Sequence, residues 1–374
     1  MKKMGVMRWL AAALTAATLV SASPVTAFAA GTTAQQVGED TIKGNTEGMD
    51  QEGETKVTTD GTKTTETASY KSKDGLTTVK TVKVTDAATK TETTTITTTT
   101  VGEGTTVSEE TVVVAKTNED GSYEVSSKTI SSTSKGKKTT VAQALTDTEY
   151  NENGYVVGET SVVTDKKQAA TIVVKKAGQA QNNLSTTKKK PTSATFNGVG
   201  NSTDALVKIS DVNVDGKTYA VTAIKKNAMR ENITAKTLVI DSKVTSIGAN
   251  AFRDCSSLSE VKINASNLKP NKLGKNSLAG ISSSAEIKLT FDGNVTLDRK
   301  TMKKYMNGLK KALGKKAYNS LKAQGKLVVN GINLKNVPTN GSYTDKDKDA
   351  SENYVPKPED ASQNGVSANT SADK

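Results

Sequence analysis

Cys255 is the first residue of this sequence to consider for catalysis, because it is the only cysteine in the chain. A thiol acts as a nucleophile or a metal ligand when a base or a positive group lowers its pKa. The sequence contains no histidine, which excludes Ser-His catalysis, Cys-His catalysis and histidine-metal sites. One cysteine also cannot form a disulfide within the chain. Cys255 is therefore a packed apolar side chain, a nucleophile or half of an intermolecular disulfide.

Two acidic segments have spacings that are similar to a calcium-binding loop. Asp211–Gly216 reads DVNVDG, but such a loop needs a bidentate carboxylate at its twelfth position, where this sequence has Thr222. Alternating valines followed by Asp-Gly instead predict a β-hairpin, with the calcium loop as the alternative. Asp345–Glu352 also lacks the required glycine and acid, and it lies in a polar tail that is predicted to be disordered. We therefore expect no metal site and no cofactor.

The third chemical feature is a concentration of positive charge near the C-terminus. Between Lys262 and Lys335 there are 16 Lys and Arg against 3 Asp and Glu, a net of +13 beside +12 for the whole chain. Within this segment, Asp298 can cap a helix whose apolar residues, Met302, Met306, Leu309 and Leu313, follow at spacings of 4, 3 and 4.

This helix has two compatible roles. Its apolar face can close the open end of a repeat domain while its lysines stay in water, and its lysines can bind an anionic partner. The lysines that are candidates for the second role are Lys303, Lys304, Lys310, Lys311, Lys315 and Lys316.

The first 29 residues are predicted to be a signal peptide. A basic start precedes an apolar run of twelve residues, Trp9–Val20, and the tripeptide Ala-Phe-Ala that ends at Ala29 suits cleavage before Ala30. The run is too short to span a bilayer, which needs about 20 apolar residues. We expect a protein that is secreted or held at the cell surface, with no transmembrane segment and no visible covalent anchor.

Residues 57–184 are rich in threonine and valine and short of aromatic residues. β-Branched side chains favour strands, and Gly-containing turn signals recur roughly 12 to 17 residues apart, with one gap near Asp86. This pattern predicts a meander of long hairpins that forms an extended β-stalk; low-complexity coil is the alternative. Residues 30–56 are predicted to be disordered, and residues 185–200 are predicted to be a linker, because a lysine run and Pro191 interrupt regular structure.

Past residue 200 the apolar positions repeat. Those from Val221 to Ile240 recur 23 residues later, and a less regular copy follows after 26 residues, with an insertion around Lys269–Pro270. A period of roughly 20 to 29 residues indicates a leucine-rich solenoid, in which the strands of successive coils stack. The predicted core residues of about three repeats are Val221, Ile224, Met229, Leu238, Ile240, Val244, Ile247, Phe252, Cys255, Leu258, Val261 and Ile263.

The most regular copy reads VTSIGANAFRDCSSLSEVKI, from Val244 to Ile263. It resembles one repeat of the BspA-type (treponemal-type) leucine-rich repeat surface proteins, whose repeats carry I-G-x-x-A-F-x-x-C-x-x-L. The neighbouring copies depart from this pattern, and the resemblance covers roughly residues 205–292. Proteins of this family are exported and bind host or neighbouring-cell molecules, which the resemblance implies for this chain. The matching residues are Ile247, Gly248, Ala251, Phe252, Cys255 and Leu258.

The repeat also indicates a role for the cysteine. Cys255 falls where the next copy has Ile281, an apolar core position. A buried free thiol behaves as a small hydrophobe, and no histidine is present to activate it. We therefore predict that Cys255 is a core residue.

The sequence thus predicts a mainly β protein with some α structure: a Thr-rich extended β-stalk, then a short leucine-rich repeat solenoid that a basic C-terminal helix caps. The predicted segments are a signal peptide (1–29), a disordered segment (30–56), the stalk (57–184), a linker (185–200), the repeat domain (201–292), a basic helical cap with a terminal hairpin (293–335) and a disordered tail (336–374).

Three classes of function remain. A non-catalytic, adhesin-like protein that binds an extracellular macromolecule agrees best with the resemblance, and an envelope protein held on anionic wall polymer is the alternative. An enzyme is the least expected class, because no motif places catalytic groups together. The expected partner is an extracellular protein or an anionic envelope polymer. Nucleic acid is not expected, because the basic segment is short of aromatics and arginine.

Overall fold

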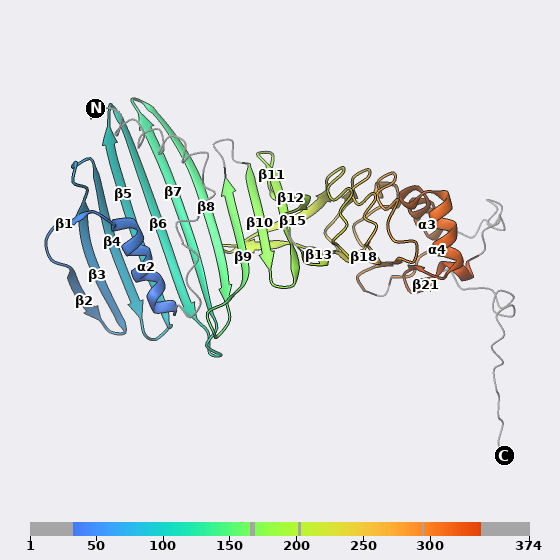
Figure 1. Ribbon diagram of the computed structural model, residues 1–374, viewed down its shortest axis with the longest axis horizontal. Helices are drawn as coiled ribbons and strands as arrows, with labels where there is room; N and C mark the ends of the chain where they lie inside the picture. Colours follow the sequence, from blue (N-terminus) through green and yellow to red (C-terminus); the bar gives the residue numbers. More distant parts are fainter. Residues whose placement is uncertain (1–32, 165–168, 201–202, 294, 338–374) are drawn as a thin grey trace, which may run out of the picture. The chain divides into compact units, whose positions relative to one another are not determined.

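The computed structural model describes residues 33–164, 169–200, 203–293 and 295–337. The chain divides into two compact units (Figure 1). The sheet unit comprises the described residues up to Ala194 together with Val212–Ala220, and the repeat unit comprises Thr195–Asp211 and the described residues from Val221 onward. The signal peptide predicted at residues 1–29 and nearly all of the tail predicted at 336–374 lie outside the described residues.

The sheet unit is an antiparallel meander in which strands that are neighbours in sequence lie side by side (Figure 1). The order is β1-β3-β4-β5-β6-β7-β8-β9-β10-β11-β12-β15-β14, and β2 also pairs with β3. The strands are β1 (Asp50–Gln51), β2 (Lys56–Asp60), β3 (Lys63–Lys71), β4 (Thr77–Asp86), β5 (Thr91–Gly102), β6 (Thr105–Thr117), β7 (Tyr123–Lys135), β8 (Lys138–Tyr150), β9 (Val156–Thr164), β10 (Ala170–Lys176), β11 (Gln179–Thr187), β12 (Lys190–Val199), β14 (Val212–Val214) and β15 (Lys217–Ile224).

The predicted hairpin meander is confirmed, because every turn signal lies between two paired strands. The glycines of these signals, such as Gly61, Gly121 and Gly136, have φ of 59°, 83° and 58°, a conformation that glycine adopts without steric cost. At the gap near Asp86 the chain also turns, with Lys90 at φ 52°. This turn contains no glycine, so the spacing of Gly-containing turn signals did not predict it.

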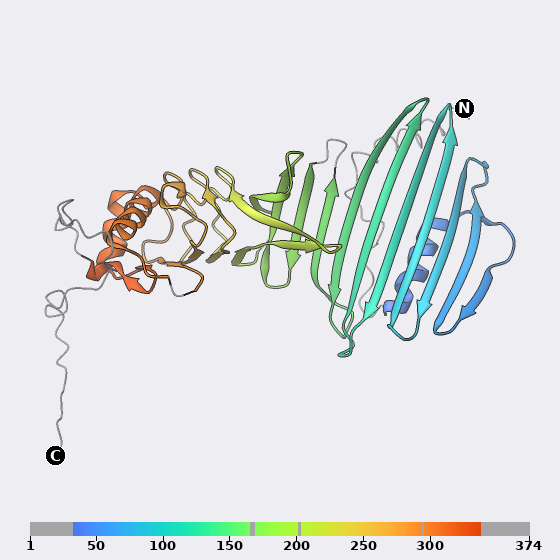
Figure 2. The ribbon, with the colours of Figure 1, turned by 180° about the vertical axis from the view of Figure 1, so that it is seen from behind.

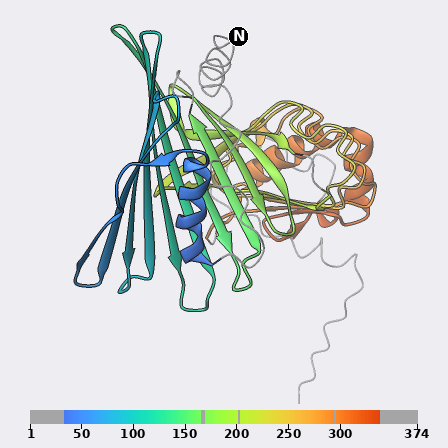
Figure 3. The same ribbon diagram turned by 60° about the vertical axis from the view of Figure 1, so that its left-hand side comes forward.

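Disorder at residues 30–56 was a wrong prediction, because this segment contains the helix α2 (Ala34–Thr46). Thr33 and Gln36 form a capping box at its start. Ala34 and Val37 then pack in one buried cluster with sheet residues that include Val113 and Tyr123. Figures 1 and 3 show α2 lying across one face of the sheet. The helix has few apolar side chains, so its periodicity is weak, and packing rather than propensity stabilises it.

The predicted linker at residues 185–200 was also wrong. Residues 185–187 end β11 and residues 190–199 form β12, so the lysine run lies in a hairpin turn. Pro191 is an exposed residue near the start of β12, a position where a strand tolerates proline. In the repeat unit, Phe196 is completely buried, and Gly198 (φ 141°) approaches the carbonyl of Ala228 so closely that a Cβ would overlap its oxygen. The end of β12 therefore belongs to the first coil of the repeats.

Gly38 lets α2 approach a charged group on the sheet. A Cβ on Gly38 would overlap Oε1 of Glu92 and lie 2.5 Å from Oγ1 of Thr94. Glu92 is only 6 % exposed, and its carboxylate lies 3.7 Å from Nζ of Lys83. That ammonium group also lies 3.4 Å from Glu39 on α2 and 3.9 Å from Glu66. Burial raises the pKa of Glu92, although Lys83 acts in the opposite direction.

We expect Glu92→Gln to stabilise the sheet unit at neutral pH and to lose this advantage in acid. Because the pKa of Glu92 is higher in the folded state than in the unfolded state, the protonated form of Glu92 contributes stability. This contribution is complete below the unfolded pKa of about 4.3 and is lost as the pH rises through the folded pKa. Glutamine keeps the volume of the side chain without its charge. Melting curves of both proteins from about pH 4 to about pH 8 measure the difference. A wild type that is more stable at neutral pH would show that the Lys83 pair outweighs the cost of burial.

The repeat unit contains a parallel ladder in the order β13-β16-β18-β19-β20, and β21 closes it as an antiparallel edge strand. Its strands are β13 (Leu206–Ile209), β16 (Thr237–Ile240), β17 (Ser246–Ile247), β18 (Glu260–Asn264), β19 (Glu286–Thr290), β20 (Leu327–Val329) and β21 (Ile332–Asn333). Its helices are η1 (Pro270–Lys272), α3 (Arg299–Leu313), α4 (Lys315–Ala323) and η2 (Leu334–Asn336).

The strand register confirms the offsets read from the sequence. Leu238 pairs with Val261, 23 residues later, and Val261 pairs with Ile287 after another 26. The ladder has more rungs than the three expected repeats. β13 precedes its partner by 31 residues, and β20 follows its partner by 40. These two end strands stack like the others but do not keep the period, so the repeat pattern did not include them. The predicted terminal hairpin is confirmed, because β20 pairs antiparallel with β21.

Candidate functional site

All twelve predicted core residues of the repeats have buried side chains. In the most regular copy, Phe252, Cys255, Leu258, Val261 and Ile263 are completely buried. The inward residues of each strand lie beside their counterparts on the next strand, because the ladder is parallel and in register. These residues build the scaffold, and the groups that can meet a partner are on its surface.

The thiol of Cys255 is unsuited to chemistry in the folded protein. Its Sγ donates a hydrogen bond to the carbonyl oxygen of Met229, 3.0 Å away. Burial raises the pKa of Cys255 to about 11, so the reactive thiolate is scarce near neutral pH. A buried, protonated thiol packs as a small apolar group.

We expect Cys255→Ala to lower the stability of the repeat unit by about 1 kcal/mol through the lost packing, and to leave binding unchanged. In the folded wild type, iodoacetamide at about pH 8 should label Cys255 only as fast as the unit unfolds. Mass spectrometry of the labelled protein against time measures this rate. Rapid labelling without unfolding would contradict the burial of the thiol.

Two lysines on the strands of the repeat unit, Lys262 and Lys288, have acidic partners. Nζ of Lys262 lies 2.7 Å from the carboxylate of Glu260, and Nζ of Lys288 lies 3.1 Å from that of Glu286. Each pair lies on one strand with its two residues on the same face. The charges of these two lysines are therefore balanced by a neighbour on the same strand.

The six lysines proposed for anion binding differ in this respect. Lys303, Lys304, Lys310 and Lys311 lie on α3, Lys315 and Lys316 lie on α4, and all six side chains are exposed. Within the described part of the chain, none of them forms an ion pair, whereas Lys262 and Lys288 do. Their positive charge therefore faces solvent.

Helix α3 is placed by its cap and by its buried face. The carboxylate of Asp298, the predicted N-cap, accepts a hydrogen bond from the backbone N–H of Thr301. The buried face differs from the predicted stripe: Tyr305 is buried and Met306 is only half-buried. The hydroxyl of Tyr305 donates to the carbonyl of Leu268 at 3.0 Å, which lets the aromatic ring enter the core. Gly314, with φ 82°, ends α3 before α4 begins.

The C-terminal end of α3 continues the backbone bonding of the coils. The N–H groups of Asn276 and Leu278 donate to the carbonyls of Lys311 and Ala312, both at 3.0 Å. The last carbonyls of a helix have no partner within the helix, so they are free to accept hydrogen bonds from the backbone N–H groups of the last coil. On the strand side, β20 covers the edge of β19. Figure 2 shows α3 and α4 at this end of the repeat unit.

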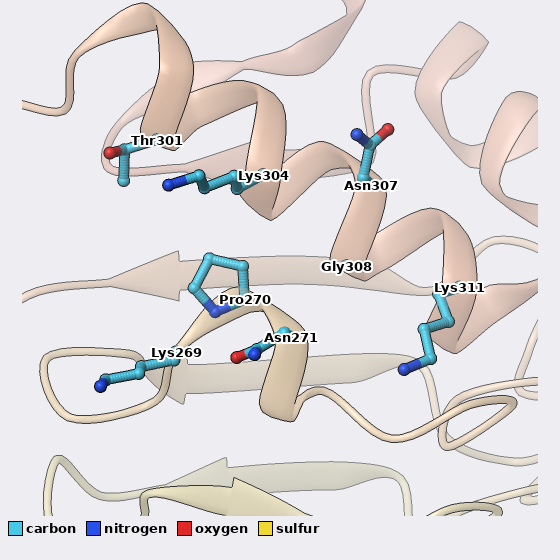
Figure 4. A pocket seen from close by; sticks show the side chains of 8 residues that line it. All are labelled: Lys269, Pro270, Asn271, Thr301, Lys304, Asn307, Gly308 and Lys311. Carbon is cyan, nitrogen blue, oxygen red and sulfur yellow. The ribbon is translucent and has the colours of Figure 1, made fainter.

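A groove lies between η1 and α3 (Figure 4). Its volume is about 670 Å³, within the range of ligand pockets, about 300–1,000 Å³. Gly308 allows the close approach of the two elements, since a Cβ there would lie 2.7 Å from the carbonyl oxygen of Pro270. The groove is lined by Lys269, Pro270 and Asn271 on one side and by Thr301, Lys304, Asn307, Gly308 and Lys311 on the other.

The groove brings together two of the six predicted lysines, Lys304 and Lys311, and adds Lys269. The other four predicted lysines lie outside its lining. The residues that sequence reasoning missed, among them Lys269 and Asn271, come from the insertion that lengthens the third copy. That insertion was the available signal, because extra residues in one repeat form a loop on one face of a solenoid.

The segment Asp211–Gly216 forms the predicted hairpin. β14 pairs antiparallel with β15, and the turn residues Asp215 and Gly216 have φ of 50° and 68°. The carboxylate of Asp211 accepts from the N–H of Val221, and that of Asp215 pairs with Lys128 at 3.3 Å. These acids therefore serve the fold. Asp345–Glu352 lies outside the described residues.

Comparison with known proteins gives one family. Residues 207–307 match the family model described as BspA type leucine-rich repeat region (6 copies), in agreement with the resemblance seen in the sequence. No curated protein and no solved structure matches the chain. In the described residues, no helix combines the length and the apolar character that crossing a membrane requires.

Proposed function

Because residues 207–307 form a BspA-type leucine-rich repeat region, we propose that this chain is an exported, non-catalytic protein that binds an extracellular macromolecule through its repeat unit. Proteins with these repeats are typically surface-associated. The predicted signal peptide agrees with export. The protein is adhesin-like and acts outside the cell, either secreted or on the cell surface.

The observation that carries this proposal is the contrast between paired and unpaired lysines in the repeat unit. Lys262 and Lys288 are paired with glutamates on the same strands, but the six predicted lysines of α3 and α4 face solvent in a segment that has a net charge of +13 between Lys262 and Lys335. A concentrated positive surface raises the association rate and affinity for an anionic partner. The macromolecule is therefore one with an anionic surface.

A second function shares the same surface. The lysines can hold the protein on an anionic wall polymer, so that it is an envelope-associated structural protein and the sheet unit acts as a spacer. Both functions are non-catalytic. The absence of histidine from the sequence and the burial of Cys255 leave no activated nucleophile of the Cys-His or Ser-His kind.

Sedimentation with purified bacterial envelopes and with immobilised extracellular proteins tests the proposal. The chain from Ala30 to Lys374 is compared with a variant in which the six lysines of α3 and α4 are glutamine. We expect the wild type to bind at low ionic strength and the variant to bind much less. Equal binding by both proteins would contradict the role of the basic surface. Binding to envelopes alone would favour the structural function, and binding to a protein ligand would favour the adhesin.

A further inference from the structure

We infer that the groove between η1 and α3 binds one strand of a linear polymer that carries anionic groups on a hydroxylated carbon backbone. This inference rests on the proposed function and adds to it a site and a ligand class. It starts from the groove itself, whose lining includes Lys269, Lys304 and Lys311 and no acidic residue.

The lysines lie apart along the groove and do not form a cluster at one point. Lys304 and Lys311 are seven residues apart on α3, so their backbone positions are separated by about 10 Å along the helix axis. Lys269 comes from the opposite wall, and Figure 4 shows its side chain and that of Lys304 extending toward the same side, with Lys311 farther along α3. One small anion cannot use all three cations equally. A chain with anionic groups at intervals can.

The residues between the lysines suit the neutral part of such a chain. Asn271 and Asn307 each offer an amide that donates and accepts hydrogen bonds, and Thr301 offers a hydroxyl. These groups match the hydroxyls of a sugar or polyol. Pro270 and the backbone at Gly308 supply an apolar surface between the walls, against which the C–H groups of the backbone can pack.

The type of cation determines how the groove can hold an anion. The planar fork of arginine pairs bidentately with carboxylate and with phosphate, whereas the lysine ammonium is a compact point charge that binds either anion without a fixed geometry. The lining contains lysine and no arginine. The groove therefore offers separate point charges, and the amide and hydroxyl groups between them select the hydroxylated backbone of the chain.

The groove is also open and held in place. Lys269, Asn271, Lys304, Asn307 and Lys311 are exposed, while Gly308 is buried. The Tyr305 hydroxyl donates to Leu268, directly before the η1 wall, and α3 is bonded to the coil through Asn276 and Leu278. An extended chain can enter along the helix axis without a rearrangement of either wall.

The test compares two triple variants of the chain from Ala30 to Lys374 that have the same net charge. The groove variant carries Lys269→Gln, Lys304→Gln and Lys311→Gln. The matched control carries Lys303→Gln, Lys310→Gln and Lys315→Gln, three exposed lysines outside the lining. Affinity is measured by biolayer interferometry for poly(glycerol phosphate), dextran sulfate, polyglutamate and neutral dextran.

We expect the wild type to bind poly(glycerol phosphate) or dextran sulfate more tightly than polyglutamate, and not to bind neutral dextran. The groove variant should lose about tenfold or more in affinity for the oxyanion polymer, beyond the loss of the control, because each lysine beside an anionic surface contributes about 1 kcal/mol. A preference between the two oxyanion polymers identifies the source of the ligand.

Equal losses in the two variants would overturn the groove as a site and leave the proposed anionic partner intact, since charge alone would then explain binding. A preference for polyglutamate would overturn the ligand class. No binding to any of the polyanions at low salt would contradict both this inference and the proposed function. Melting curves of all three proteins establish that the variants are folded.

Discussion

Deletion of Asp298–Gly325 is expected to unfold the repeat unit or to lower its melting temperature by about 10 °C or more. The deletion removes α3 and α4 and, with them, seven buried apolar side chains. It also leaves the N–H groups of Asn276 and Leu278 without the carbonyls of Lys311 and Ala312. Each kcal/mol shifts the melting temperature by about 4–8 °C in a domain of 60–100 residues and by about 2–4 °C in one of 150–250, and one buried leucine contributes about 2–5 kcal/mol. The apolar side chains are those of Met302, Tyr305, Leu309, Ala312, Leu313, Tyr318 and Leu321.

Calorimetry measures this effect, and alkylation of Cys255 gives a second measurement that is local to the repeats. The truncated protein should label at this thiol much faster than the wild type. The triple variant Lys303→Gln, Lys310→Gln and Lys315→Gln is the control, because it changes the exposed face of the helices and keeps the apolar face. An unchanged melting transition in the truncated protein would show that α3 and α4 do not cap the repeats.

The second large effect is expected from one methyl group in the most regular repeat. A Cβ on Gly248 would overlap the backbone nitrogen of Lys226 and lie 2.6 Å from the carbonyl carbon of Lys225. Both atoms belong to the backbone of the preceding coil, to which Gly248 itself is bonded through its N–H and the carbonyl of Ile224, 2.9 Å apart. The two coils must separate to accept alanine. We therefore expect Gly248→Ala to cost about 3 kcal/mol, the upper end of overpacking, or more.

Chemical denaturation of Gly248→Ala and the wild type gives this difference. Gly44→Ala is the matched control: a Cβ on Gly44 would meet nothing within 4 Å, and alanine is favoured over glycine inside a helix by about 1 kcal/mol. A loss of less than about 0.5 kcal/mol for Gly248→Ala, the range of ordinary surface substitutions, would mean that the coils are not as close as the structure places them. The expected large loss would also explain why this repeat pattern carries glycine at that position.

The repeat core could be predicted from the sequence because stacking enforces a period. Each strand of the ladder repeats the environment of the last, so Leu238, Val261 and Ile287 share one type of position. The end strands β13 and β20 share that environment without sharing the spacing. Their connections contain the hairpin β14–β15 at one end and the helices α3 and α4 at the other.

The errors arose where contacts distant in sequence decided the structure. Helix α2 has only a narrow apolar face, and the sheet residues around Tyr123 supply most of its buried cluster. The lysine run before Pro191 occurs in a hairpin because β12 has neighbours to pair with. Tyr305 is buried instead of Met306 because its hydroxyl reaches the carbonyl of Leu268. In each case a weak local pattern was overridden by packing.

The groove was only partly predictable. The charge of the C-terminal segment and the face of Lys304 and Lys311 follow from helical spacing. Their association with Lys269 and Asn271 depends on where the insertion in the third copy folds, and on Gly308, which lets α3 approach Pro270. Sequence spacing does not report that approach.

The central claim is that the partner binds to the basic surface of the repeat unit. Lysine footprinting of the bound protein tests this claim most directly. Protein bound to envelopes or to an oxyanion polymer is acetylated briefly, and mass spectrometry compares each lysine with the free protein. We expect protection of Lys269, Lys304 and Lys311 and of their neighbours on α3, while exposed lysines of the sheet unit, such as Lys80 and Lys116, react as in the free protein. Protection of the sheet unit with an unprotected α3 would contradict the account.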